Sequence, residues 1–218
     1  MAHIPDGVLS APVLALGAAV AIAGCAQGLR KLDVDRIPQV AVLSAAFFVA
    51  SLVHFTVGPS SVHLLLSGLI GIFLGWAAFP AVLVALFLQA ILFGFGGLVS
   101  LGVNVMNMAA PAVFCGAAFR WVAARGNAKL AITAAGVLGG LGVILTALFV
   151  AFDLMLSGKE FLPAAKLLVF AHLPVAAIEA VFSAAAVAVF LRSRPESLGF
   201  PETFRGSSEA MGEEIVHD

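Results

Sequence analysis

The sequence contains no tyrosine and few charged residues. Asp, Glu, Lys and Arg make up 11% of its 218 residues, whereas hydrophobic residues make up 62%. Because a soluble domain carries roughly 25% charged residues, this composition excludes an ordinary cytosolic enzyme, a disordered chain and a protein that binds nucleic acid. The 83 residues between Arg36 and Arg120 contain no Asp, Glu, Lys or Arg, and this length is enough for three to four crossings of about 20 residues each. The chain is therefore predicted to be a polytopic integral protein of the lipid bilayer.

Other features are scarce or missing as well. Cysteine occurs only at Cys25 and Cys115, inside apolar segments, so no disulfide framework is implied. The segment 22–25 resembles a lipoprotein processing site, but a signal peptide begins with positive charge. Because residues 1–29 contain no Lys or Arg, the first 24 residues are expected to stay in the mature chain. The phosphate-binding motif G-x-x-x-x-G-K-[ST] is absent, so we expect any ATP hydrolysis that the protein depends on to belong to a separate subunit.

Breaks at Gly, Pro and charged residues predict an all-α fold of about seven transmembrane helices. The predicted helices span residues 8–29, 38–57, 63–79, 80–93, 103–119, 130–152 and 167–191. Only residues 76–80 separate the third from the fourth, so six helices is the alternative. Residues 1–191 form the predicted transmembrane domain, and residues 192–218, rich in Ser, Pro, Gly and Glu, form a flexible cytoplasmic tail.

The basic residues predict the orientation. With seven crossings, nine of the eleven Lys and Arg residues fall on one side, and only Lys159 and Lys166 fall on the other. The positive-inside rule then places the C-terminus in the cytoplasm and the N-terminus outside. The outer face would collect the polar N-terminal segment 2–7, the loops 58–63 and 94–107, and His172.

A histidine next to a free N-terminal amine can chelate a metal ion. The amine, the backbone nitrogen of the histidine and its Nδ1 atom close two fused rings around one ion, in the planar geometry that Ni²⁺ and Cu²⁺ favour. Such binding releases protons. If Met1 is removed, Ala2 supplies the amine and His3 two nitrogens, and a fourth ligand comes from elsewhere. If Met1 stays, the first three residues alone offer four nitrogens. The alternative is that His3 is only a polar residue at the membrane surface.

Four motifs follow the order and spacing of the CbiM/NikM family. They are His3-Ile4-Pro5-Asp6-Gly7, Ser60-Ser61-Val62-His63-Leu64-Leu65, Gly94-Phe95-Gly96-Gly97 with Asn104-Val105-Met106-Asn107-Met108, and His172-Leu173-Pro174 with Glu179. The chain resembles this family, the substrate-specific membrane component of energy-coupling-factor transporters for cobalt or nickel, over nearly its whole length except the tail. Family members usually begin Met-His, and here Ala2 intervenes.

The resemblance implies a Co²⁺ or Ni²⁺ site formed by the amine of Ala2, the amide and imidazole of His3, and the imidazole of His63. It does not separate cobalt from nickel, and it implies no permanently bound cofactor. It also implies a CbiQ-like transmembrane coupling component, a CbiO-like ATPase and, in some systems, a small CbiN-like membrane subunit. The expected location is the bacterial inner membrane.

Two histidines and one carboxylate could serve as further ligands. His54 precedes the loop 58–63 and is an alternative ligand to His63. Glu179 lies in the middle of the last predicted helix, where an ionisable group costs about 2.5–3.5 kcal/mol. We expect a protonated or hydrogen-bonded structural role for it, with metal binding or proton coupling as alternatives. His172 lies seven residues earlier and shares the same helix face.

Three other polar residues are expected to orient the N-terminal segment. Asn104 and Asn107 lie on one helix face and are predicted to bond this segment or the outer loops. The alternative is that they are solvent-facing loop residues. Asp6 could hold the region around His3 in place or cap a helix.

Two other functions and one docking surface stay open at this point. An intramembrane serine protease would use Ser60 or Ser61 with His172, although Val62 stands where a glycine is expected after Ser61. A proton-linked carrier would use Glu179 with His172. A stripe of small residues on the first helix permits close helix approach, either within the chain or as the docking surface for the coupling component; it consists of Ala11, Ala15, Ala19 and Ala23.

Overall fold

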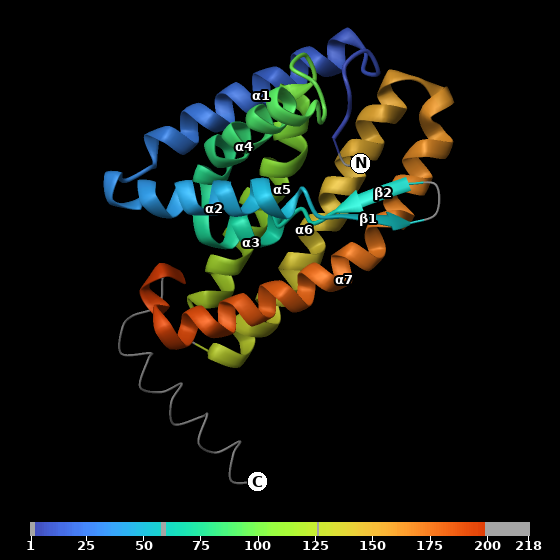
Figure 1. Cartoon of the computed structure of the whole chain (residues 1–218). Coiled ribbons are helices and arrows are strands. Elements are labelled where there is room, and N and C mark those ends of the chain that lie inside the picture. The colour runs from blue at the N-terminus through green and yellow to red at the C-terminus, as the bar shows by residue number, and fades with distance from the viewer. Residues whose placement is uncertain (1–2, 58–59, 126, 199–218) are drawn as a thin grey trace.

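The computed structural model describes residues 3–57, 60–125 and 127–198, and for residues 54–57, 60–62 and 197 it describes the backbone alone (Figure 1). Seven α-helices make up most of this part of the chain. They are α1 (Ala11–Arg30), α2 (Ile37–Ala50), α3 (Ser67–Leu74), α4 (Ala78–Phe93), α5 (Leu101–Ala123), α6 (Ala128–Ser157) and α7 (Leu162–Ser193). Short 3-10 turns cover Val34–Arg36, Gly75–Ala77, Lys159–Phe161 and Pro195–Leu198.

In the described residues the predicted all-α class is confirmed, apart from one short β-hairpin between α2 and α3. Strand β1 (His54–Val57) pairs antiparallel with β2 (Ser60–His63), and His54 lies opposite His63. The predicted second helix extended to residue 57 and the third began at 63, and both bounds are wrong. Aromatic and β-branched residues favour a strand, and the intervening Gly-Pro pair favours a turn. This local preference outweighs the apolar run that suggested continuous helix.

The prediction of a multi-pass helical membrane protein is confirmed. In the part of the chain that the structure describes, five helical segments are long and apolar enough to cross a membrane, namely Ala11–Arg30, Ser67–Phe93, Leu101–Ala123, Ala128–Ser157 and Lys159–Ser193. Helix α2 has 14 residues, fewer than the roughly 20 that a crossing needs. The second predicted crossing, residues 38–57, contains β1 and all but the first residue of α2. The third, residues 63–79, contains the end of β2, all of α3 and the start of α4. The number of crossings and the orientation therefore stay predictions.

Helix α3 lies at the centre of the bundle because glycine lets it approach α5 closely. All residues of α3 are buried. A Cβ atom on Gly71 would overlap the carbonyl oxygen of Ala112, and one on Gly116 would overlap the carbonyl oxygen of Gly71. Small residues at helix contacts in membrane proteins allow such backbone approach. The close packing fixes α3 against α5; α3 also contacts α6, and strand β2 of the hairpin that precedes α3 contacts α7.

Helix α1 presents glycine to the bundle and alanine to its surroundings. A Cβ atom on Gly17 would overlap Val103, one on Gly24 would overlap Phe79, and one on Gly28 would lie 2.5 Å from the carbonyl oxygen of Trp76. The predicted alanine stripe is exposed along its length; it comprises Ala11, Ala15, Ala19 and Ala23. The glycine face therefore packs within the chain, and the alanine face remains open.

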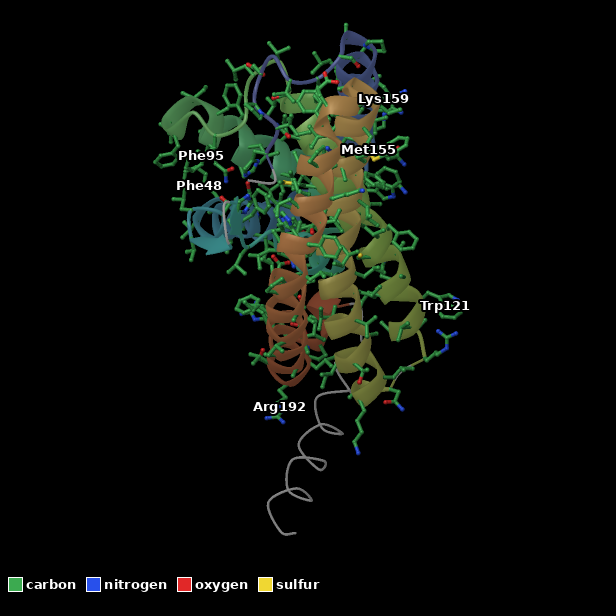
Figure 2. All side chains as sticks on the ribbon, turned by 90° about the vertical axis from the view of Figure 1, so that its right-hand side faces the viewer. Phe48, Phe95, Trp121, Met155, Lys159 and Arg192 are labelled. Atoms are coloured by element: carbon green, nitrogen blue, oxygen red, sulfur yellow. The ribbon has the colours of Figure 1, made fainter. Side chains whose placement is uncertain are left out.

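Lys159 and Arg192 lie toward opposite ends of the bundle (Figure 2). Figure 2 shows Phe95 and Lys159 near one end, and Trp121 and Arg192 toward the other. At the first end the backbone N–H of Ser10 donates to Ser157 Oγ (3.1 Å), which joins the start of α1 to the end of α6. This distribution agrees with the predicted separation of Lys159 from most other basic residues.

The predicted flexible tail falls mainly outside the described residues. Its first residues complete α7 and form the 3-10 turn Pro195–Leu198, where Leu198 is buried. The predicted start of the tail at residue 192 therefore lies inside α7.

Candidate metal centre

The N-terminal segment enters the bundle and is held there by α5. His3 is 5% exposed and Ile4 is buried. The Asn104 carboxamide pairs with the main chain of Ile4: its Oδ1 accepts from the Ile4 N–H (2.9 Å) and its Nδ2 donates to the Ile4 carbonyl (3.0 Å). Ser100 Oγ donates to the same carbonyl (2.7 Å). The contact expected between Asn104 and the N-terminal segment is therefore present, and it fixes the residue that follows His3.

The loop between α4 and α5 packs on this segment. Ser100 N–H donates to Asp6 Oδ1 (2.8 Å), so Asp6 binds the loop. Asp6 is not the cap of α1, because Ser10, which directly precedes that helix, occupies the cap position. A Cβ atom on Gly97 would overlap the Asp6 carboxylate. Gly96 has a φ of +74° and lies close enough that a Cβ atom there would be 3.4 Å from His3 Cβ. The two glycines allow the loop to close over the segment.

Hydrogen bonds shift the acidity of Asp6. Its slight burial acts to raise the pKa, but N–H groups of Ser100, Val99 and Leu98 and the Ser100 hydroxyl favour the ionised form, and the net effect lowers the pKa from its ordinary value. Hydrogen bonds to a carboxylate stabilise its charged form. Asp6 is exposed to solvent, so this contact responds directly to the pH of the medium.

We expect acid to release the contact between Asp6 and the loop. Because the folded-state pKa of Asp6 is lowered, the contact is fully present above the ordinary aspartate pKa of about 3.9 and is lost as the pH falls through the lower folded-state value. Hydrogen exchange at the Ser100 amide should show constant protection above about pH 4 and declining protection below it. Asp6→Asn should weaken protection above about pH 4, where the parent carboxylate is ionised. Equal protection in the parent protein at pH 5 and pH 2.5 would contradict this assignment.

His3 and His63 lie face to face inside the bundle. Their ring centroids are 4.7 Å apart and their planes differ by 12°. His63 is fully buried, and its Nδ1 lies 2.9 Å from the carbonyl oxygen of Leu64. A carbonyl only accepts hydrogen bonds, so Nδ1 carries the proton and Nε2 the lone pair. Metal-binding histidines are usually oriented by such a bond. Two of the three predicted ligand residues are therefore in contact, and Ala2 lies outside the described residues.

Glu179 on α7 holds the chain that follows His63. It is fully buried, and its Oε1 accepts hydrogen bonds from the backbone N–H groups of Leu65 and Leu66, the latter at 2.8 Å. Leu66 has a φ of +49°, a left-handed conformation. The carboxylate thus stabilises the sharp turn between β2 and α3 and sets the position of His63.

His172 lies on the same helix, also buried. Its Nδ1 lies 2.7 Å from the carbonyl oxygen of Leu168, so Nδ1 donates and Nε2 carries the lone pair. Nε2 has no hydrogen-bond partner among the described residues. His172 and Glu179 share a face of α7, as expected, and this helix contacts β2.

Asn107 has a different partner from the one predicted. Its Nδ2 donates to Asp153 Oδ2 on α6 (2.8 Å), rather than to the described part of the N-terminal segment. Asp153 is 4% exposed. It was not predicted, because the predicted helix ended at residue 152, whereas α6 continues to Ser157. A carboxylate inside an apolar helix is itself a signal of function, and it could have identified Asp153.

Three predicted residues, His54, Ser60 and Ser61, are described by their backbone alone. His54 pairs with His63 through the backbone of the hairpin, and Ser60 and Ser61 lie on β2. Within the described residues, no group of three or more His, Cys, Asp or Glu side chains could hold a metal.

Comparison with known proteins identifies the family of the chain. A family model of the cobalt uptake substrate-specific transmembrane region, CbiM, matches residues 3–197. A putative metal transport protein from Haemophilus influenzae is 43% identical over 210 residues, which cover 93% of this chain and 99% of that protein. The fused nickel transport protein NikMN of Rhodobacter capsulatus is 33% identical, and the match covers 90% of this chain and 63% of the fused protein.

Solved structures agree with the sequence relatives. A crystal structure described as a transition metal transporter has a TM-score of 0.75 and 26% identity, and the match covers 96% of this chain and 99% of that chain. A truncated transition metal transporter has a TM-score of 0.72 and 29% identity, with 87% and 97% coverage. The family match spans the N-terminal segment, the hairpin and all seven helices, and the chain therefore belongs to the CbiM family of cobalt and nickel uptake membrane proteins.

Proposed function

We propose that this chain is the substrate-binding component of an ATP-driven energy-coupling-factor transporter and captures Co²⁺ or Ni²⁺ at the outer face of the bacterial inner membrane. The observation that carries the proposal is the contact between His3 and His63, whose rings stack with centroids 4.7 Å apart. It brings the N-terminal peptide, with its main-chain nitrogens, to a buried imidazole from another part of the chain.

The ligand set follows from the donors at this point. The amine of Ala2, the amide and Nδ1 of His3, and Nε2 of His63 supply four nitrogens. Two nitrogens bound to one ion lie roughly 3–4 Å apart, because a metal–nitrogen bond measures about 2.0 Å. The lone pair of each ring nitrogen lies in the plane of its ring, so we expect the stacked rings to turn when both bind one ion. Four nitrogens in a plane favour Ni²⁺, whereas the family includes cobalt transporters. If Met1 is retained, the first three residues supply four nitrogens and His63 is not needed in the plane.

The burial of His3 and His63 bears on how the ion is held and released. An ion bound by these two residues exchanges its water ligands for nitrogens inside the bundle. Release therefore requires the N-terminal segment to move. Asn104 and Ser100 hold this segment at Ile4, and the loop holds Asp6. A partner that displaces the loop between α4 and α5 would therefore weaken ion binding.

Titration with nickel tests the proposal. Coordination by a backbone amide requires that amide to lose its proton, and the N-terminal amine has a pKa of about 7.7–8.0. We therefore expect roughly one to two protons to be released per Ni²⁺ bound at pH 7, together with a four-coordinate planar absorption spectrum. His3→Ala should abolish both signals. Binding without proton release, with a six-coordinate spectrum, would contradict the chelate.

The proposed partners supply what this chain lacks. The sequence holds no nucleotide-binding motif, so a CbiO-like ATPase must drive transport through a CbiQ-like coupling component. The name of the fused relative NikMN joins two components, and this favours a CbiN-like membrane subunit as an additional partner. The exposed alanine face of α1 suits a close helix contact with the coupling component.

Bulky residues on the alanine face should weaken assembly without affecting metal binding. We expect Ala15→Leu with Ala19→Leu to lower retention of a co-expressed coupling component about tenfold, a change of about 1.4 kcal/mol, because leucine prevents close helix approach. Both positions are exposed, so nickel affinity should stay unchanged. Co-purification and metal titration measure the two effects. Unchanged retention would place the docking surface elsewhere.

The two rival functions make different predictions. A proton-linked carrier would take up metal without the ATPase and would lose transport with Glu179→Gln. A serine protease would cleave peptides, and blocking the N-terminus would not affect it. Glu179 already accepts two backbone hydrogen bonds, which supports a structural role over proton transfer.

A further inference from the structure

Two adjoining cavities at the Arg192 end of the bundle concentrate positive charge. One, of about 400 Å³, is lined by Arg36, Arg120 and Glu196 with neighbouring apolar residues, and the other, of about 290 Å³, is lined by Lys31, Arg36 and Arg120. Arg36 and Arg120 line both. Within the described residues, Glu196 is the one acidic side chain that lines either cavity. Asp33 and Asp35, in the connection between α1 and α2, line neither.

The fold brings these cations together from three elements. Arg36 Nη2 donates to the carbonyl oxygen of Phe73 (2.7 Å) at the end of α3. The chain then turns at Gly75, whose φ is +56°, and a Cβ atom there would lie 2.8 Å from Arg120 Nη1 on α5. Lys31 Nζ lies 5.5 Å from the centroid of the Trp76 ring. Three like charges at one point repel a transported cation and call for an anionic ligand.

An apolar groove begins beside this charge. It runs between α2 and α4, has a volume of about 400 Å³, and shares Leu32 with the cavity lined by Lys31. Among the described residues, Ser44 is the one polar residue that lines it, and its hydroxyl donates to the carbonyl oxygen of Ala81 (2.7 Å). The groove follows α2 from Ile37 to Phe48, a length of about 17 Å. This is close to half the roughly 30 Å hydrocarbon thickness of a bilayer.

We propose that an anionic phospholipid binds here, with its phosphate between Lys31, Arg36 and Arg120 and one acyl chain in the groove between α2 and α4. The charge selects an anionic headgroup, and the groove selects a ligand with a long apolar tail. A free phosphate would leave the groove unfilled. An extended acidic peptide in the groove would leave its backbone polar groups without partners, which is costly inside a membrane, whereas an acyl chain carries none.

The site lies where such a lipid is available. The basic residues stand at the end of the bundle that their own distribution predicts to be cytoplasmic, and basic pockets between helices on that side bind anionic headgroups. The lipid would reduce the repulsion between the cations and fasten α2 to α4. Neither effect involves His3 or His63, so this inference does not rest on the proposed metal site.

Thermal unfolding of the delipidated full-length chain in an uncharged detergent tests the proposal. Phosphatidylglycerol at about one hundred times its dissociation constant should raise the unfolding midpoint by roughly 5–10 °C. Phosphatidylcholine or inorganic phosphate at the same concentration should give less than a fifth of that shift. An equal shift with phosphatidylcholine, or with inorganic phosphate alone, would overturn the proposal.

Variants locate the site. Arg36→Gln with Arg120→Gln should remove most of the phosphatidylglycerol shift, and Ala45→Phe, which fills the groove, should do so with all cations kept. Arg125→Gln is the matched control, since Arg125 lies over the Trp121 ring and lines neither cavity; it should keep the full shift. If the double variant does not fold, Ala45→Phe decides alone. An undiminished shift in Ala45→Phe, or stabilisation by an acidic segment of the coupling component but not by the lipid, would overturn the proposal.

Discussion

Replacement of His63 by alanine is expected to remove most of the affinity of the chain for Ni²⁺ and Co²⁺. His63 stacks on His3 at 4.7 Å and presents Nε2, because its Nδ1 binds the Leu64 carbonyl oxygen. Changes to groups that only orient a metal ligand typically cost 10- to 100-fold in affinity. Loss of the ligand itself should cost more than 100-fold, since three nitrogens of one peptide would remain for a site that needs four.

The measurement is equilibrium metal binding by purified protein whose first residue is known to be Ala2. His217→Ala is the matched control: it removes a histidine that is not among the proposed ligands, and it should bind as the parent does. A thermal unfolding curve checks that His63→Ala is folded. Parent-like affinity in a folded His63→Ala protein that begins at Ala2 would exclude His63 as a ligand.

Replacement of Glu179 by alanine is expected to destabilise the protein strongly. Its carboxylate accepts from the buried N–H groups of Leu65 and Leu66, and each N–H left without a partner costs about 1–3 kcal/mol. The cavity left by a buried side chain adds to this cost. We expect the free energy of unfolding to fall by about 3–6 kcal/mol, and nickel affinity to fall as well because His63 directly precedes this turn.

Glu179→Gln is the matched variant for this position. Its side-chain oxygen can accept the same two hydrogen bonds, so it should retain most of the stability and metal affinity that Glu179→Ala loses. Denaturant unfolding in detergent, followed by circular dichroism, measures the difference. Equal stability of Glu179→Ala and the parent would show that the carboxylate does not hold the turn.

Much of the fold could be predicted from the sequence because the bilayer imposes it. A run of 83 residues without Asp, Glu, Lys or Arg is typical of membrane-spanning helices, and the Gly-Pro and charged breaks between them follow from backbone preferences. The hairpin is the exception. Residues 54–57 extend the apolar run of the preceding helix and were predicted as its end, although these aromatic and β-branched residues and the following Gly-Pro pair favour a strand and a turn.

The candidate site was predictable in its residue types but only partly in its contacts. The chelating chemistry of an N-terminal histidine and the cost of a buried Glu179 follow from the residues alone. The partner of Asn107 does not, because it depends on where α6 ends: the helix runs five residues beyond the predicted end at 152, and these include Asp153. The inward glycine face of α1 was also not predicted. Alanine and glycine are both small and both recur along this helix, and only the packing shows that the glycines face the bundle.

The most direct test of the central claim compares metal binding by chains with free and acetylated N-termini, after sequencing of the first residue. Acetylation removes the basic amine and leaves every side chain unchanged. We predict that the free chain binds about one Co²⁺ or Ni²⁺ ion and that the acetylated chain binds neither ion at the same concentration. Equal loading of the two chains would contradict a site built on the N-terminal amine.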